Sequence, residues 1–153
     1  MDNPLFERLR DDACAFRPID RAAAFRCVTD DALPLQTLVE IAAIPRHHFF
    51  GRKVQIHIIN NIRNGLCPED CGYCAQRKTA TEEIPTYAMK SEEEVMKEAE
   101  NAYASGAYRY CLVSSGRGPN GNGVARLANI IRAIKTRFPS LKICLSAGIL
   151  KDH

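Results

Sequence analysis

The chain has 153 residues, and its 21 basic and 18 acidic side chains give a formal net charge of +3. This balance is too mild to indicate nucleic-acid binding, while the length and the 46% hydrophobic content suffice for a domain core. No apolar run approaches the roughly 18 residues of a membrane span, and the charged N-terminus does not resemble a secretory signal. We therefore expect a cytoplasmic protein that binds neither nucleic acid nor membrane.

The first 50 residues are predicted to be helical. The helical candidates are residues 6–14, residues 19–28 and an amphipathic segment that begins at Leu35 and ends at Pro45. A run of alternating β-branched residues at 54–59 then predicts the first strand. The polar residues at 60–66 lead into a cluster of cysteines and predict a loop.

Strands and helices alternate along the rest of the chain. Ser91 and Glu94 have the spacing of a capping box and predict a helix that Gly106 ends. The remaining expected elements are a strand at 109–113, a glycine-rich loop at 114–123, a helix from Val124 that Pro139 ends, and a strand at 141–145. This alternation predicts a parallel sheet whose active site lies at the carboxyl ends of the strands.

The cysteines are unusual for an ordinary α/β domain. Seven cysteines without a secretory signal indicate a reduced compartment, where clustered thiols bind metal or carry out chemistry. Cys67, Cys71 and Cys74 place three soft thiolates in one loop, a donor set suited to an iron–sulfur cluster, Zn²⁺ or Cu(I). Three ligands on a four-iron cluster leave one iron open, whereas structural zinc takes four ligands. Cys111 could be that fourth ligand, so zinc remains an alternative.

The residues around these cysteines resemble a known family. The spacing CxxxCxxC, with the aromatic Tyr73 before the third cysteine, is that of the radical S-adenosylmethionine superfamily. The longer string NGLCPEDCGYCAQ, residues 64–76, resembles the biotin synthases more narrowly. Residues 110–119 and 142–148 share this resemblance, which runs from about His48 to the last residue.

The resemblance implies two metal cofactors. Cys67, Cys71 and Cys74 would hold a [4Fe–4S] cluster whose open iron binds S-adenosylmethionine. Cys111 and Cys144 match two ligands of a second, [2Fe–2S] cluster that donates sulfur. On their own, these two cysteines would be read as small buried hydrophobic residues of strands.

The resemblance also implies contacts to S-adenosylmethionine and a reaction. Tyr73 would pack along the adenine, and Ser114, Ser115 and Gly116 would line the loop that meets the methionyl end. No side chain is expected to be catalytic by itself, because the cofactors carry the chemistry. The implied reaction converts dethiobiotin to biotin by hydrogen abstraction and sulfur insertion. Its electrons would come from a donor such as flavodoxin or ferredoxin, and the full-length enzyme would be a homodimer.

The expected fold is α/β, with an N-terminal helical segment at 1–50 and the first three β/α units of a TIM-type barrel at 51–153. The other ligands of the second cluster and the residues that bind dethiobiotin would lie further along the barrel. The chain is therefore expected to be truncated and inactive alone. Two alternatives stay open: a related radical enzyme such as a maturase or an amino-acid mutase, and a non-catalytic metal-binding fragment. Cys111 and Cys144 favour the biotin synthases over the former.

Overall fold

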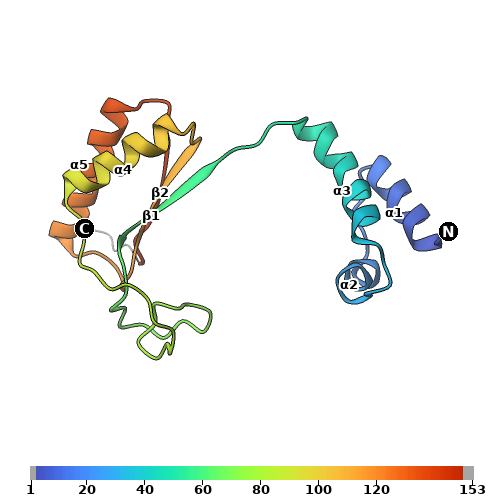
Figure 1. Cartoon of the computed structure of the whole chain (residues 1–153), viewed down its shortest axis with the longest axis horizontal. Coiled ribbons are helices and arrows are strands. Elements are labelled where there is room, and N and C mark those ends of the chain that lie inside the picture. The colour runs from blue at the N-terminus through green and yellow to red at the C-terminus, as the bar shows by residue number, and fades with distance from the viewer. Residues whose placement is uncertain (1–2, 150–153) are drawn as a thin grey trace. The chain divides into compact units, whose positions relative to one another are not determined.

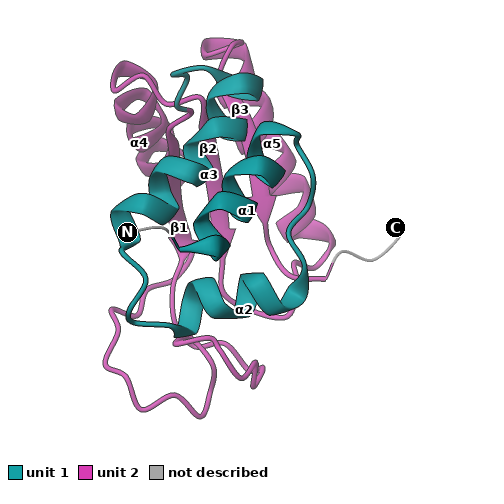
Figure 2. Cartoon of the chain, turned by 90° about the vertical axis from the view of Figure 1, so that its right-hand side faces the viewer, with its two compact units in different colours: residues 1–54 teal, residues 55–153 magenta. Residues whose placement is uncertain are grey.

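A computed structural model describes residues 3–149, and the chain divides into two compact units, Met1–Val54 and Gln55–His153 (Figure 1 and Figure 2). Each unit buries a cluster of apolar side chains of its own. Across the described residues, no helix has the length and apolar character needed to cross a membrane. The assignment of residues 51–153 to an incomplete barrel domain stays a prediction.

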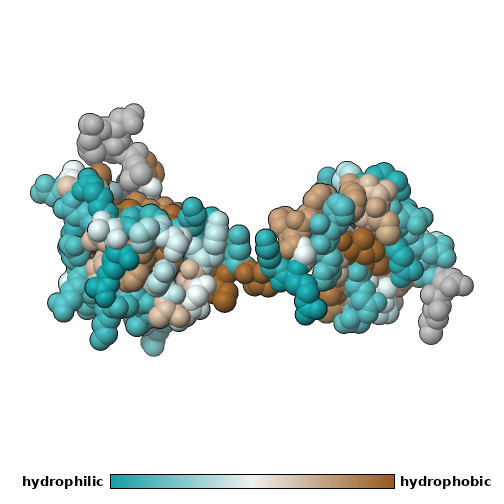
Figure 3. Space-filling view, turned by 90° about the horizontal axis from the view of Figure 1, so that it is seen from above, coloured by the Kyte–Doolittle hydropathy of each residue, from teal (hydrophilic) through white to brown (hydrophobic). Residues whose placement is uncertain are grey.

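Unit 1 consists of three helices, α1 (Pro4–Cys14), α2 (Arg21–Thr29) and α3 (Leu35–Phe50). The side chains of Asn3 and Asp20 cap the first two helices by accepting hydrogen bonds from backbone amides. The buried residues of this unit are Leu5, Leu9, Ala23, Leu33 and Ile41. Figure 3 shows hydrophobic residues on its surface as well, and the large exposed ones include Phe25, Val28, Val39 and Phe50.

The third helix continues past Pro45, so the prediction that it ends there was wrong. Pro45 has no amide hydrogen and removes one helical hydrogen bond, to the carbonyl of Ile41, but the helix continues on both sides of it. The chain leaves the helix at Gly51, which has a φ of 57°. The Arg46 guanidinium donates to the Gly51 carbonyl at 2.8 Å and stabilises this exit.

Unit 2 is a three-stranded parallel sheet with two helices on one side of it (Figure 1). Its elements are β1 (His57–Arg63), α4 (Glu92–Ala104), β2 (Arg109–Ser114), α5 (Gly121–Arg137) and β3 (Lys142–Ser146), with the strand order β1-β2-β3. The predicted fold class is confirmed: helices precede a parallel sheet in which three strands alternate with two helices, the arrangement with which a TIM-type barrel begins.

The helices of unit 2 begin at capped residues. Ser91 and Glu94 form the predicted capping box of α4, in which each side chain bonds the other residue's backbone amide. Helix α5 begins at Gly121, earlier than the predicted Val124, because the Asn120 side chain accepts from the Gly123 amide at 2.9 Å. The cap therefore turns the end of the glycine-rich segment into the first turn of a helix.

The sheet buries one face and leaves the other open. Ile62 and Leu112 are fully buried, and with Tyr110 they pack into a core with residues of α4 and α5. Because side chains alternate along a strand, Ile59 and Cys111 lie on the opposite face, where Ile59 is 66% exposed. The helices thus cover only one of the two faces.

The first strand lies further along the chain than residues 54–59, so its predicted position was wrong. Val54 and Ile56 precede the strand and are 79% and 52% exposed, while Asn60 and Ile62 occupy the face under the helices. The polar Asn60 was expected to begin a loop. Asn60 fits the core because Lys90 and Tyr110, which are distant in sequence, provide its hydrogen bonds. The local sequence pattern gives no sign of these partners.

The two faces of β1 offer a direct test of this packing. Replacing the buried Ile62 with alanine should lower the free energy of unfolding by about 2–5 kcal/mol, because it removes apolar contacts and leaves a cavity. The matched change Ile59→Ala, on the open face of the same strand, should cost well below about 1 kcal/mol. Urea unfolding followed by circular dichroism measures both. Equal losses would contradict the assignment of faces.

Candidate functional site

The cysteine loop, residues 65–86, connects β1 to α4 and projects as a long irregular segment beyond the carboxyl end of β1 (Figure 1). Gly65, with a φ of 71°, turns the chain out of the strand. A Cβ atom at Gly65 would lie 2.6 Å from the Thr86 hydroxyl, so a larger residue would push the two ends of the loop apart. The site predicted at the carboxyl ends of the strands therefore lies on a loop with a narrow base.

The three clustered cysteines are free thiols of this loop, with Cys71 exposed and Cys67 and Cys74 partly exposed. The Cys74 amide donates to the Cys71 carbonyl at 3.0 Å, so these two residues share one turn. Three accessible soft thiolates in one loop fit the chemistry of an iron–sulfur cluster. Within residues 3–149, however, no three Cys, His, Asp or Glu side chains are gathered as a metal site.

Hydrogen bonds shape the interior of the loop and attach it to its surroundings. Gln76 accepts from the Gly65 amide at 3.1 Å, and the Arg77 guanidinium donates to the Gly72 carbonyl at 2.6 Å. Glu69 forms an ion pair of 3.3 Å with Arg117, which follows β2. A cavity of about 570 Å³ lies along the loop, with Cys67 and Gln76 among its lining residues.

The residues assigned to S-adenosylmethionine lie in two places. Tyr73 is 96% exposed on the cysteine loop, so its ring is free to pack against a ligand. Ser114 ends β2, and Gly116 follows it with a φ of 114°. Ser115 is buried, and its hydroxyl donates to the Gly65 carbonyl at 2.6 Å, so it connects β2 to the base of the cysteine loop.

Cys111 and Cys144 lie directly opposite each other on neighbouring parallel strands. Both alternate with residues that pack into the helix-covered core, which places them on the open face of the sheet. Burial, and then the neighbouring Cys144, raises the pKa of the Cys111 thiol. The structure thus brings the two predicted ligands of the second cluster together, away from the cysteine loop in sequence.

A polar network under α4 was not predicted. Asn60, Lys90, Glu98 and Tyr110 bond one another between β1 and the helix. Burial raises the pKa of Tyr110 to about 12, so its hydroxyl stays protonated at neutral pH. The one signal in the sequence is Asn60 itself, which keeps the two-residue alternation with Ile58 and Ile62 and thus predicts a polar partner in the core.

Comparison with known proteins confirms the expected resemblance to biotin synthases. The chain is 48% identical over 131 residues to the biotin synthase of Magnetococcus marinus, covering 86% of this chain and 40% of that protein. The match to the biotin synthase of Acaryochloris marina is 50% over 133 residues, 87% of this chain and 38% of that protein. The match to the biotin synthase of Kocuria rhizophila is 37% over 144 residues, 94% of this chain and 31% of that protein. The chain thus spans two fifths or less of these relatives. No protein-family profile matches it.

The fold also resembles a solved structure. The crystal structure of HydG, a maturase of the [FeFe]-hydrogenase, superposes with a TM-score of 0.59 at 20% sequence identity. The match covers 89% of this chain and 29% of that chain. At this identity the likeness supports the fold and leaves the roles of individual residues as predictions.

The contact between the paired thiols can be tested in the metal-free protein. Replacing Cys144 with alanine should lower the pKa of Cys111, because it removes the neighbouring group that disfavours the thiolate. Alkylation of Cys111 should then become half-maximal at a lower pH, which peptide mass spectrometry across a pH series measures. Cys74 in the same samples is the internal control and should not respond. An unchanged profile for Cys111 would contradict the contact.

Proposed function

We propose that this chain forms part of a biotin synthase, a radical S-adenosylmethionine enzyme that inserts sulfur into dethiobiotin. The similarity to biotin synthases at 37–50% identity carries this proposal, because it extends over 77–94% of the chain across three such relatives. The geometry supports it, since the cysteine loop and the Cys111–Cys144 pair both belong to the parallel sheet unit where the fold class places active sites. The reaction belongs to the whole enzyme, of which this chain is a portion.

Cys67, Cys71 and Cys74 are the proposed ligands of a [4Fe–4S] cluster. Their loop leaves Cys71 exposed and Cys67 and Cys74 partly exposed, and three thiolates on a four-iron cluster would leave one iron open to S-adenosylmethionine. When bound, this cluster supplies the electron that cleaves S-adenosylmethionine and starts the radical reaction. The protein's part is to hold the three thiolates together and to orient the substrate.

The residues around the loop are proposed to bind S-adenosylmethionine. The exposed ring of Tyr73 would give an apolar surface for the adenine, and Ser114 and the backbone of Gly116 would meet the methionyl end. Ser115 has a different part, because its hydroxyl is already committed to the Gly65 carbonyl. We assign it to holding the loop that meets the ligand, a role that its backbone amide shares by donating to the Arg63 carbonyl at 3.1 Å.

Cys111 and Cys144 are proposed as two ligands of a [2Fe–2S] cluster on the open face of the sheet. Their direct pairing across β2 and β3 puts two thiols side by side, as a two-iron cluster requires. In a closed barrel this face is the interior, which shields a reactive intermediate from water. Dethiobiotin would bind there. A flavodoxin or ferredoxin as electron donor, a homodimeric whole enzyme and a cytoplasmic location complete the proposal.

The alternatives differ from this proposal in what they require of the paired thiols. A related radical enzyme with another substrate needs only the three thiols of the cysteine loop. A non-catalytic metal-binding fragment needs no precise position for these thiols or for the Cys111–Cys144 pair. The direct pairing of Cys111 with Cys144 is the structural feature that favours biotin synthase. In the whole enzyme, loss of the [2Fe–2S] cluster on replacing Cys111 or Cys144, with the [4Fe–4S] cluster retained, separates these functions.

Reconstitution of the reduced chain with iron and sulfide should give a brown protein with the spectrum of a [4Fe–4S] cluster. Replacing Cys71 with alanine should abolish that spectrum, because two remaining thiolates cannot hold a four-iron cluster with an open site. Iron and sulfide analysis with visible and electron paramagnetic resonance spectra are the measurements. The matched control is Cys14→Ala, at an exposed cysteine of α1, which should keep full cluster content. Full cluster content in Cys71→Ala would overturn the ligand assignment.

A further inference from the structure

The segment at 87–90, which we call the return segment, carries the chain from the cysteine loop back to α4 and lies along the end of β1. Asn64 and Tyr87 form an antiparallel bridge in which each amide donates to the other's carbonyl, at 3.3 and 3.1 Å. The Lys90 amide donates to the Ile62 carbonyl at 2.8 Å. Backbone contacts therefore close the cysteine loop at its base.

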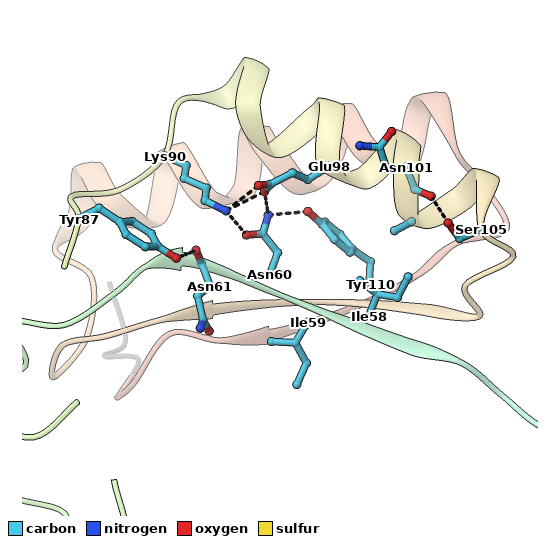
Figure 4. A pocket seen from close by; sticks show the side chains of 11 residues that line it. Ile58, Ile59, Asn60, Asn61, Tyr87, Lys90, Glu98, Asn101, Ser105 and Tyr110 are labelled. Atoms are coloured by element: carbon cyan, nitrogen blue, oxygen red, sulfur yellow. Dashed lines mark hydrogen bonds and ion pairs between the residues drawn. The ribbon is translucent and has the colours of Figure 1, made fainter. Parts of the chain in front are cut away.

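Two side chains of the return segment reinforce this closure (Figure 4). The Tyr87 hydroxyl donates to the Asn61 carbonyl at 2.8 Å. The Lys90 ammonium donates to the Asn60 carboxamide oxygen at 2.8 Å and to the two Glu98 carboxylate oxygens at 2.7 and 2.9 Å. Its three hydrogens thus have three acceptors, one from β1 and two from α4.

The surroundings of Lys90 make its position specific. It lines a cavity of about 400 Å³ between β1 and α4, together with the buried Asn60 and Tyr110. Asn60 donates in turn to the Tyr110 hydroxyl at 2.5 Å, so the network reaches into β2. Leaving one of the polar groups of this network without a hydrogen-bond partner would lower the stability of the fold. A shift of the return segment would break the bonds of Lys90, so the network favours one position of the segment.

We propose that Tyr87 and Lys90 are positioning residues that fix the base of the cysteine loop and thereby hold its three thiolates in place for a metal cluster. This inference rests on the proposed function for the identity of the ligand, an iron–sulfur cluster. Neither residue is among the proposed ligands. Tyr87 acts through the backbone carbonyl of Asn61, and Lys90 acts through the side chains of Asn60 and Glu98. The loop itself is mostly exposed, so its position depends on these attachments rather than on a core.

Hydrogen exchange on the cluster-free chain tests the positioning directly. Tyr87→Phe removes only the hydroxyl, and the hydrogen-bonded amides of the loop, such as Gly65, Cys74 and Lys78, should exchange about fivefold faster, as expected for loss of one hydrogen bond. Lys90→Met should have a larger effect, because it leaves the Glu98 carboxylate without its cation and the Asn60 carboxamide oxygen without its donor. Lys90→Arg should restore part of the protection. The matched control is Tyr103→Phe, at a half-exposed tyrosine of α4 outside the network, which should not change the loop.

The reconstituted chain provides the second measurement. The Tyr87→Phe variant should lose its cluster to a chelator about fivefold faster than the unchanged chain, while amides of α4 and α5 keep their protection. Loop exchange equal to that of Tyr103→Phe would overturn the inference, and so would a uniform loss of protection in α4 and α5. If the unchanged chain takes up no cluster but its loop still responds to Tyr87→Phe, the proposed ligand is wrong and the positioning role stands.

Discussion

The side chains of the three parallel strands alternate between two faces, and α4 and α5 pack against only one of them. Ile62, Tyr110 and Leu112 are buried in this contact, which supplies the apolar area that holds unit 2 together. The same alternation places Cys111 and Cys144 on the face that the helices leave open. The packing that stabilises the fold thus also leaves Cys144 exposed and Cys111 partly exposed. A cofactor on the open face leaves the helix contact undisturbed.

One part of the covered face is polar, and it connects the core to the cysteine loop. Burying Asn60 among apolar residues is unfavourable unless its amide is fully bonded, and Lys90, Glu98 and Tyr110 provide those bonds. Apolar residues could fill this space with similar stability, but they would tolerate several positions of the return segment. A network of directed hydrogen bonds favours a single position, which suits a segment that must close a functional loop.

The sequence could predict the order of elements, because helix caps and alternating apolar residues are local signals, as Ser91 and Glu94 show in α4. It misplaced β1 because Asn60 was read as the start of a loop, although its partners come from α4 and β2. The cysteine spacing could identify the thiols of the site. It could not show that Ser115 is committed to the Gly65 carbonyl, since that contact joins residues 50 positions apart. Local patterns therefore predict which residues belong to the candidate site, and contacts between residues far apart in sequence determine how they are held.

Strand β2 contributes to both sets of thiols. Cys111 lies within the strand, opposite Cys144, while Ser115 just beyond its end bonds the Arg63 and Gly65 carbonyls at the base of the cysteine loop. Ser115 is the fourth residue after Cys111, which places the two about 13 Å apart along an extended chain at roughly 3.3 Å per residue. The register between β1 and β2 shifts between Asn61 and Arg63, next to this junction, and so sets the direction in which the loop leaves the sheet. Because one strand carries Cys111 and also bonds the base of the cysteine loop, it keeps the two sets of thiols at a constant separation.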